Sequence, residues 1–416
     1  MTLNQENSAG ASLVRRPFIT LLAANALSTT GNMLSILAVP WFVLDTTGSA
    51  ALTGLAAFAM TFPIVISAAF GGTLVDWLGF RVTSVLSDLV SGLLVLALPV
   101  LFLTGGLSYP LLLVLLFLRW TASTPGETAR KAMLPDLAAL AGVPIERATA
   151  AYDGVYRGSA MVGAPLAGVL ILWLGPSLPL FVDGVTFLLS ALLVAGGVPR
   201  VVQRERERGG YLDGLRAGLA FLWRDRLQLS ATAMIVVVNL LDTGVTQVLL
   251  ALYARDVVGD PRAFGLLTGA LGAGAVAGTV VYGAVGSRLP MRLTYGLCFL
   301  VAGVPRVLVL ALDAPFFVAM AVTALSGFAA GAINPILGIL QYARIPVRMR
   351  ARVIGAMTAA AYAGMPVGGL LAGALSTLTS LGTTLLAFTV VYVLISVPPF
   401  VLRTWRELDR GRPADA

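Results

Sequence analysis

Apolar runs long enough to cross a lipid bilayer follow one another along this 416-residue chain, and they restrict its fold more than any other feature. About 20 apolar residues span the hydrocarbon core as a helix, and a helix pairs its backbone polar groups internally. Charged residues, glycines and prolines divide the sequence into twelve such runs, at residues 18–43, 51–75, 82–104, 109–130, 151–173, 178–199, 228–253, 262–286, 292–312, 314–338, 352–377 and 380–402. We therefore predict an all-α membrane protein with twelve transmembrane helices.

One long charged connection separates six of these runs from the other six, and it predicts a boundary between two six-helix bundles. The expected divisions are a tail over 1–17, a bundle over 18–200, a central loop over 201–227, a bundle over 228–402 and a tail over 403–416. In the loop, leucines recur at helical spacing beside charged residues, at Leu212, Leu215, Leu219 and Leu222. This pattern indicates an amphipathic helix lying on the membrane surface, with a partner-binding site as the alternative.

Short motifs recur in both halves in the same order, which favours an internal repeat. Residues 72–81 are echoed by 283–292, residues 163–168 by 364–369, and Thr124-Pro125 by Asn334-Pro335. A transporter built from such repeats binds its substrate near the membrane midplane, between the two bundles. Polar residues in the middle of the spans are therefore the candidates for a binding site.

The distribution of positive charge predicts the orientation in the membrane. Twelve spans place both chain ends on one side, and that side carries 23 of the 28 lysines and arginines. Only Arg255 and Arg262 fall on the opposite side. Because cytoplasmic loops carry the excess of basic residues, we expect both termini in the cytoplasm. The net charge of +8 then requires no nucleic acid as a partner.

The residue types that are missing exclude several classes of function. The chain has no histidine and one cysteine, Cys298, so neither an intramolecular disulfide nor a cysteine-ligated metal site is expected. No Ser/His/Asp set, metal cluster or phosphate-binding glycine loop is recognisable, and an enzyme is improbable. We expect no metal and no cofactor, and any proton transfer must fall to carboxylates.

Two mid-span charges are the main candidates for transport chemistry, because an unpaired charge there costs about 2.5 to 3.5 kcal/mol. Burial raises the pKa of a carboxylate toward neutrality, so Asp242, with Asn239 on the same helical face, is predicted to be the leading proton or cation site. Arg119 is the second candidate. The alternatives are structural ion pairs, of Arg119 with a carboxylate such as Asp88 and of Asp242 with Arg306.

Three further polar residues are weaker candidates for the same cavity. Asp183 lies in the sixth run, Asn32 in the first and Asn334 in the tenth. Their side chains could bind substrate or bond to other helices, and the structural role is the more common one.

A polar turn joins the second and third runs, with Gly72, Leu74, Asp76, Gly79 and Arg81 in the spacing G-x-L-x-D-x-x-G-x-R. Glycine permits the positive φ that a tight turn needs. An acidic and a basic residue at the membrane edge could interact with helix ends, or they could belong to an ordinary turn.

This spacing resembles the loop between the second and third helices of major facilitator superfamily transporters. The resemblance implies that Asp76 braces the second helix against the eleventh, so that Gly72, Asp76, Gly79 and Arg81 form a conformational gate. It also implies a part in proton transfer for an arginine in the fourth helix, a position that Arg119 matches.

The fifth run carries small residues and a proline, Gly158, Gly163, Pro165 and Gly168, which let helices approach closely. This run resembles the G-P-x-x-G-G signature of exporters within the superfamily. Further motifs resemble its macrolide-efflux and enterobactin-exporter branch, among them Thr124-Pro125, residues 133–137, and Asp183 with Phe187 and Ser190.

That resemblance implies a secondary exporter in the bacterial inner membrane. It would move small, partly hydrophobic molecules of the drug, antibiotic or siderophore class by alternating access, with protons as the counter-ion, and we expect it to act as a monomer. An importer of a small metabolite on the same fold and a non-transporting membrane receptor or scaffold are the alternatives.

Overall fold

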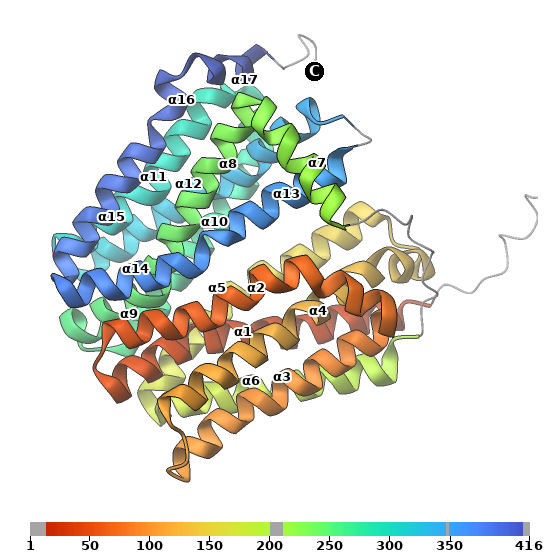
Figure 1. The fold of residues 1–416 in the computed structure, drawn as a ribbon, viewed down its shortest axis with the longest axis vertical. Helices are drawn as coiled ribbons and strands as arrows, with labels where there is room; N and C mark the ends of the chain where they lie inside the picture. The colour runs from red at the N-terminus through yellow and green to blue at the C-terminus, as the bar shows by residue number, and fades with distance from the viewer. Residues whose placement is uncertain (1–13, 200–210, 347–348, 411–416) are drawn as a thin grey trace, which may run out of the picture.

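The computed structural model describes residues 14–199, 211–346 and 349–410, and all regular structure in these ranges is helical. Six long helices form the N-terminal half (Figure 1): α1 Arg16–Thr47, α2 Ala50–Leu78, α3 Phe80–Leu103, α4 Tyr109–Ala141, α5 Ile145–Leu174 and α6 Ser177–Gly197. A shorter helix, α7 Tyr211–Arg224, leads into the C-terminal half.

The C-terminal half is also built from six spans, two of them made of several segments. The first comprises α8 Arg226–Gly244, a π-helical turn η1 Val245–Leu249, α9 Leu250–Leu252 and a second π-helical turn η2 Tyr253–Val258. The others are α10 Pro261–Val285, followed by the 3-10 turn η3 Gly286–Arg288, then α11 Met291–Ala311, α12 Phe316–Arg344, α13 Arg350–Ala363 continued by α14 Met365–Leu378, and α15 Leu381–Ser396. The short segments α16 Pro398–Val401, η5 Arg403–Arg406 and α17 Glu407–Arg410 end the described chain.

Twelve spans in two bundles confirm the predicted fold class. Eleven of them are long and apolar enough to cross a membrane by length and composition alone. The remaining span, α4, carries Arg119, Glu127 and Arg130 along its length. It also runs eleven residues beyond the predicted end at residue 130, because Met133, Leu137 and other apolar residues pack beside α1 and α6.

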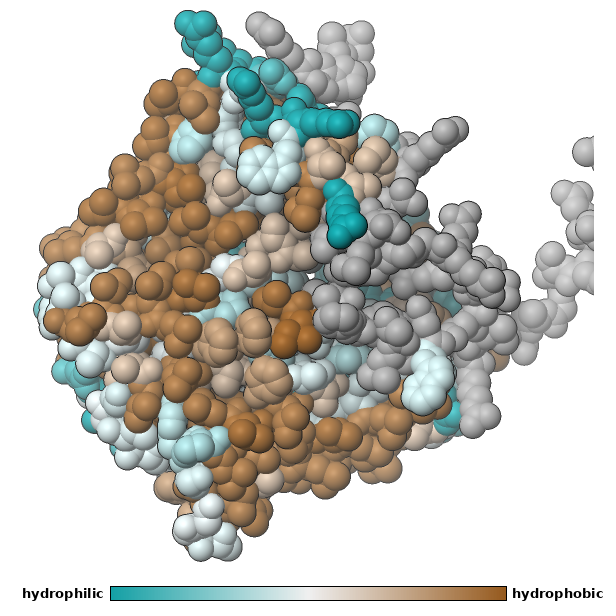
Figure 2. All heavy atoms as spheres, in the orientation of Figure 1, coloured by the Kyte–Doolittle hydropathy of each residue, from teal (hydrophilic) through white to brown (hydrophobic). Residues whose placement is uncertain are grey.

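In each half of the molecule, several chain connections lie together at one end of the bundle. The starts of α1, α3 and α5 and the ends of α2, α4 and α6 lie at one end of the N-terminal bundle, and α7 lies at the corresponding end of the C-terminal bundle (Figure 1). We call this end of the molecule the terminal face and the other end the opposite face. Figure 2 shows hydrophobic side chains over the flanks of both bundles and hydrophilic ones gathered near α17.

Local chemistry explains where several helices begin and end. The side chain of Ser49 accepts a hydrogen bond from the backbone N–H of Leu52 and caps α2, and Asp225 caps α8 through the N–H groups of Leu227 and Gln228. Gly79 separates α2 from α3 at φ 85°, so the predicted positive φ of this turn is confirmed.

The internal repeat is visible in two equivalent contacts. Arg81, near the start of α3, donates a hydrogen bond to the carbonyl oxygen of Ala195 near the end of α6. Arg292, near the start of α11, donates to the carbonyl oxygens of Pro399 and Phe400 just beyond α15, at 2.6 and 2.7 Å. In each half an arginine on the third span therefore holds the end of the sixth, where the helix dipole is negative.

The segment after α15 folds back on the terminal face instead of leaving the bundle. Trp405 is fully buried, stacks on Tyr295 with ring centroids 5.2 Å apart, and donates a hydrogen bond to Ser230 at 3.1 Å. Arg344, at the end of α12, contacts both Asp225 and Glu407 at 2.8 and 2.9 Å. Part of the predicted C-terminal tail is thus docked on the second bundle.

Candidate transport site

The two halves meet along a seam of small residues near the opposite face. On one side α2 packs against α14, where a Cβ added to Gly54 would lie 2.4 Å from the carbonyl oxygen of Gly369. On the other side α5 packs against α10, where a Cβ on Gly265 would lie 2.5 Å from the carbonyl oxygen of Ala164. Side chains larger than hydrogen cannot fit at these positions, so the seam closes through direct contact between backbones.

Between the halves, on the terminal side of this seam, lies a cavity of about 580 Å³. Most of its wall comes from α1, α2, α4 and α5, and the C-terminal half contributes Gln247, Tyr362 and Met365. Apolar, aromatic and polar side chains alternate in this wall, as in pockets that hold drug-sized molecules. We call this space the central cavity.

A chain of polar contacts runs from the central cavity into the N-terminal half. Glu127, in the cavity wall, accepts a hydrogen bond from Asn32 at 3.3 Å, and Asn32 accepts one from Arg119 at 2.6 Å. Arg119 forms an ion pair with Asp183 at 2.7 Å, and Ser35 donates to the same carboxylate. Arg119 and Asp183 are 1% and 0% exposed, so both charges lie behind the cavity wall and depend on each other for neutralisation.

A second buried pair lies closer to the terminal face. Arg130 donates to both carboxylate oxygens of Asp88, at 2.8 and 2.9 Å, and to Ser28 at 3.1 Å, while Ser190 donates to Asp88 at 2.6 Å. The structural alternative, in which Arg119 pairs with a carboxylate such as Asp88, is met by a different carboxylate, because Arg119 pairs with Asp183 and Asp88 pairs with Arg130.

In the C-terminal half, Asp242 on α8 contacts Arg306 on α11 and Tyr392 on α15. Arg306 and the hydroxyl of Tyr392 both donate to the same carboxylate oxygen, and Arg306 also donates to that hydroxyl at 3.0 Å. The Asp242 side chain is 42% exposed, whereas that of Arg306 is 7% exposed. The ion pair expected as the structural alternative for Asp242 is thus present, yet its carboxylate stays accessible.

Comparison with known proteins decides the family. A family model described as a transmembrane secretion effector matches residues 7–411. This chain is a member of that family. Two curated relatives agree: the multidrug efflux pump Tap of Mycobacterium tuberculosis is 31% identical over 96% of this chain and 97% of its own, and Tap of Mycolicibacterium fortuitum is 32% identical over 95% and 98%.

Solved structures share the fold of this chain. The nucleoside transporter NupG has a TM-score of 0.76 at 13% identity and covers 92% of this chain and 98% of its own. A bacterial homologue of the human lysosomal transporter Spinster, in an inward-facing and unoccupied conformation, has a TM-score of 0.71 at 15% identity and covers 97% and 100%. The fold is therefore the transporter fold of the major facilitator type.

Of the six residues predicted for the cavity, the described cavity wall contains one, Asn32. Arg119 and Asp183 lie behind it, and Asn239 instead donates a hydrogen bond to the carbonyl oxygen of Ala361 at 3.0 Å. Asn334 is exposed on α12, outside the described cavity wall. Helical spacing alone could not place these residues, because it says which face they share and not which neighbour covers that face.

The predicted gate stays a prediction, because the surroundings of Gly72 and the side chain of Asp76 lie outside the described residues. Arg81 bonds to α6 within its own half. The four residues of the fifth span do not share one contact. Gly168 and Pro165 pack on α10, Gly163 packs on α1, and a Cβ on Gly158 would meet nothing within 4 Å.

Glu127 is the residue that reasoning from the sequence missed. It belongs to a stripe of α4 that faces the cavity through Trp120, Ser123, Thr124, Glu127, Thr128 and Lys131. This spacing of three and four residues is the mark of one helical face, and its polarity inside a transmembrane span indicates contact with water. The spacing is present in the sequence, and Glu127 falls within the predicted span at residues 109–130, but it is not among the residues predicted for the cavity.

Proposed function

We propose that this protein exports small, partly hydrophobic molecules of the drug, antibiotic or siderophore class, in exchange for protons, by alternating access of the central cavity. The observation that carries the proposal is the cavity itself, drug-sized and lying between two halves that meet closely along a seam of small residues. The curated relatives of this chain are named multidrug efflux pump Tap.

The orientation follows from charge. We assign the terminal face to the cytoplasm of a bacterial cell, because 23 of the 28 basic residues lie in connections and tails on that side. In this conformation the cavity therefore lies on the cytoplasmic side of the closed seam. An exporter needs this arrangement before it binds its substrate. A single chain encloses the cavity, which supports action as a monomer.

Coupling to protons is assigned to the two buried or half-buried carboxylates that hold an arginine in each half. Protonation of Asp242 would release Arg306 from its partner, and protonation of Asp183 would do the same for Arg119. An unpaired arginine inside the membrane is costly, so each proton transfer favours a rearrangement of helices around it. Protonation of either carboxylate would therefore change the packing of the helices around the arginine.

The test is a transport assay in inverted membrane vesicles with an imposed pH gradient, screened with drug, antibiotic and siderophore-like molecules. Export corresponds to uptake that depends on the gradient and disappears with a protonophore. Asp242→Asn is expected to abolish the dependence on the gradient while the protein still inserts. Asp45→Asn, which alters an exposed carboxylate near the opposite face, serves as the matched control and is expected to transport normally.

Two results would contradict the proposal. Uptake by right-side-out vesicles with no uptake by inverted ones would point to an importer. Full coupling in Asp242→Asn would remove this carboxylate from the mechanism and leave Asp183 as the remaining candidate.

A further inference from the structure

Glu127 and Asp153 are the two acidic residues in the described wall of the central cavity, and Glu127 is the one on α4, the helix that carries the buried Arg119. It lies on α4, exposed to the central cavity and about two turns from Arg119. The hydrogen bond from the Asn32 amide, at 3.3 Å, is the only side-chain bond that the described residues give it. An ionised carboxylate can accept about four hydrogen bonds, so most of its acceptor capacity faces the cavity.

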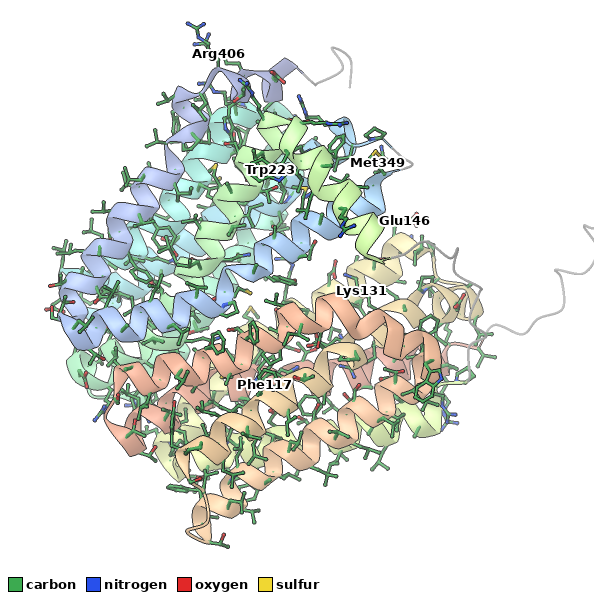
Figure 3. The ribbon with its side chains drawn as sticks, viewed as in Figure 1. Phe117, Lys131, Glu146, Trp223, Met349 and Arg406 are labelled. Atoms are coloured by element: carbon green, nitrogen blue, oxygen red, sulfur yellow. The ribbon has the colours of Figure 1, made fainter. Side chains whose placement is uncertain are left out.

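The nearby positive charges are already engaged or lie farther out. Arg119 is paired with Asp183 and Arg130 with Asp88, each in a buried one-to-one contact. Lys131 is one turn farther along α4 at the wide end of the gap between the halves (Figure 3), and within the described residues no ion pair within 4 Å joins it to Glu127. A long lysine side chain at a helix end can extend its ammonium group into water.

The remaining charges around the cavity do not cancel Glu127 either. On α5, Asp153 also lines the cavity, whereas Arg157, one turn later, is outside the described lining, so this helix adds a second carboxylate and no positive charge to the described wall. On α1, α2 and α13 the described lining residues are uncharged. The cavity therefore presents a carboxylate in its wall whose nearest partner is a neutral amide.

Two tyrosines from different halves of the molecule line the same cavity as this carboxylate. Tyr156 on α5 and Tyr362 on α13 are 55% and 37% exposed. Aromatic ring faces attract cations, and the attraction grows where water is excluded. A cavity wall that combines a carboxylate with exposed aromatic rings therefore suits an organic cation.

We propose that Glu127 determines the charge specificity of the central cavity and that the cavity selects apolar molecules carrying a positive charge. The cation would lie against Glu127, with Tyr156 on one side and Tyr362 on the other. Because Tyr362 belongs to the C-terminal half, the bound cation contacts both halves and is released when they rock apart. The inference rests on the proposed function as an exporter and adds the class of molecule it binds.

The test uses two probes of the same size and shape and opposite charge, tetraphenylphosphonium and tetraphenylborate. Their equilibrium binding to the purified full-length protein in lipid nanodiscs is measured directly, without transport. The wild-type protein is expected to bind the phosphonium at least about tenfold more tightly than the borate, a ratio that corresponds to about 1.4 kcal/mol. Glu127→Gln is expected to weaken phosphonium binding by about tenfold or more and to leave borate binding unchanged or stronger.

Matched variants separate charge recognition from folding. Asp136→Asn removes an exposed carboxylate of the same helix that lies outside the described cavity lining, and it is expected to leave the binding of both probes unchanged. Glu127→Asp restores the charge and is expected to recover part of the binding that Glu127→Gln loses. All variants are compared by thermal unfolding, and a binding loss counts only in a variant that unfolds at the wild-type temperature.

The outcomes that overturn the inference are distinct from failure of export. Failure of the wild type to bind the phosphonium, equal binding of both probes, or unchanged binding by a folded Glu127→Gln would each remove Glu127 from substrate recognition. Gradient-dependent uptake of a neutral molecule in the vesicle assay would leave the exporter function intact in that case. Phosphonium binding without gradient-dependent export would instead contradict the proposed function and leave the binding site standing.

Discussion

Two arginine–aspartate pairs are buried in the N-terminal half, and their surroundings differ. Arg130 also donates to Ser28 and Ser190 donates to Asp88, and this pair resembles a fixed structural contact. Arg119 uses one terminal nitrogen for both Asn32 and Asp183, while its other two nitrogens are buried without a partner in the described part of the chain. An incompletely bonded buried charge needs an explanation beyond stability.

We expect paired substitutions to separate these roles. Removing one partner of either pair leaves a buried charge and costs about 3 to 5 kcal/mol. Removing both partners avoids that cost, so Arg130→Gln with Asp88→Asn should fold and transport, whereas Arg119→Gln with Asp183→Asn should fold and fail to transport. Thermal unfolding and gradient-driven uptake measure the two properties. Transport by the second double variant would make its ion pair structural.

For single residues, the sequence predicts which charged side chains are energetically costly inside a transmembrane span. It does not predict which side chains contact each other. Arg119 and Asp242 stood out because a charge in a span is rare. Asp183 was ranked lower because nothing in its local sequence shows that α6 passes beside α4. Partners far apart in sequence are chosen by helix packing, and only the fold supplies that information.

Helices α5 and α10 approach so closely that their contact requires glycine, which has only a hydrogen atom in the side-chain position. We predict that Gly265→Val raises the free energy of the closed seam by about 1 to 3 kcal/mol, because the new carbons would overlap the backbone of α5. The population with the cavity open at the terminal face should then fall. Labelling of a cysteine placed at Thr128, in a Cys298→Ser background, measures that population with a membrane-impermeant maleimide.

Gly158→Val is the matched control for this experiment, since a Cβ at Gly158 meets nothing within 4 Å. It introduces the same side chain into α5 and should leave the labelling rate unchanged. Equal effects of the two substitutions would show that helix propensity, and not the seam, causes the change.

The segment after α15 is a second element whose packing has a measurable consequence. Trp405 is fully buried against Tyr295. Trp405→Ala should therefore destabilise the C-terminal half by about 3 to 5 kcal/mol. Trp223 on α7, 73% exposed (Figure 3), provides the comparison, and Trp223→Ala should change the unfolding temperature little. Similar losses in both variants would contradict docking of this segment.

Helices were the most predictable elements, and their limits the least. The lengths of the apolar runs predicted the position of every span. Helices α4 and α5 extend beyond the predicted segments, because their outer turns pack on neighbouring helices instead of on lipid. The amphipathic central helix was predicted from its leucines and is present as α7. Its buried Leu222 packs on Val353 and Met357 of α13, a contact that periodicity could not reveal.

The molecule as a whole consists of two similar halves joined by one covalent connection and a seam. The repeat predicted from three echoes agrees with the equivalent contacts of Arg81 and Arg292, each of which ties the third span of its half to the sixth. What the sequence could not predict is which of the two ends is closed. That depends on small differences in free energy between two arrangements of the same helices.

A covalent link across the seam tests whether rocking is required. We predict that a disulfide between Ala57→Cys and Gly369→Cys, again with Cys298→Ser, abolishes transport when oxidised and that a reductant restores it. The two Cβ positions are 2.7 Å apart, about 1 Å closer than a disulfide prefers, so a small shift of the helices suffices. Each single-cysteine variant should transport normally, and undiminished transport by the oxidised protein would exclude opening at this seam.

The π-helical turns η1 and η2 follow Asp242 directly in the same span. A π-helical turn contains one residue more than an α-helical turn. When the turn tightens into α-helix, the extra residue becomes part of the next α-helical turn. The part of the span that carries Asp242 would then swivel by about 100° relative to its outer end. A carboxylate beside such a turn can be rotated away from Arg306 while the helix keeps its backbone hydrogen bonds, so that no backbone group is exposed to lipid.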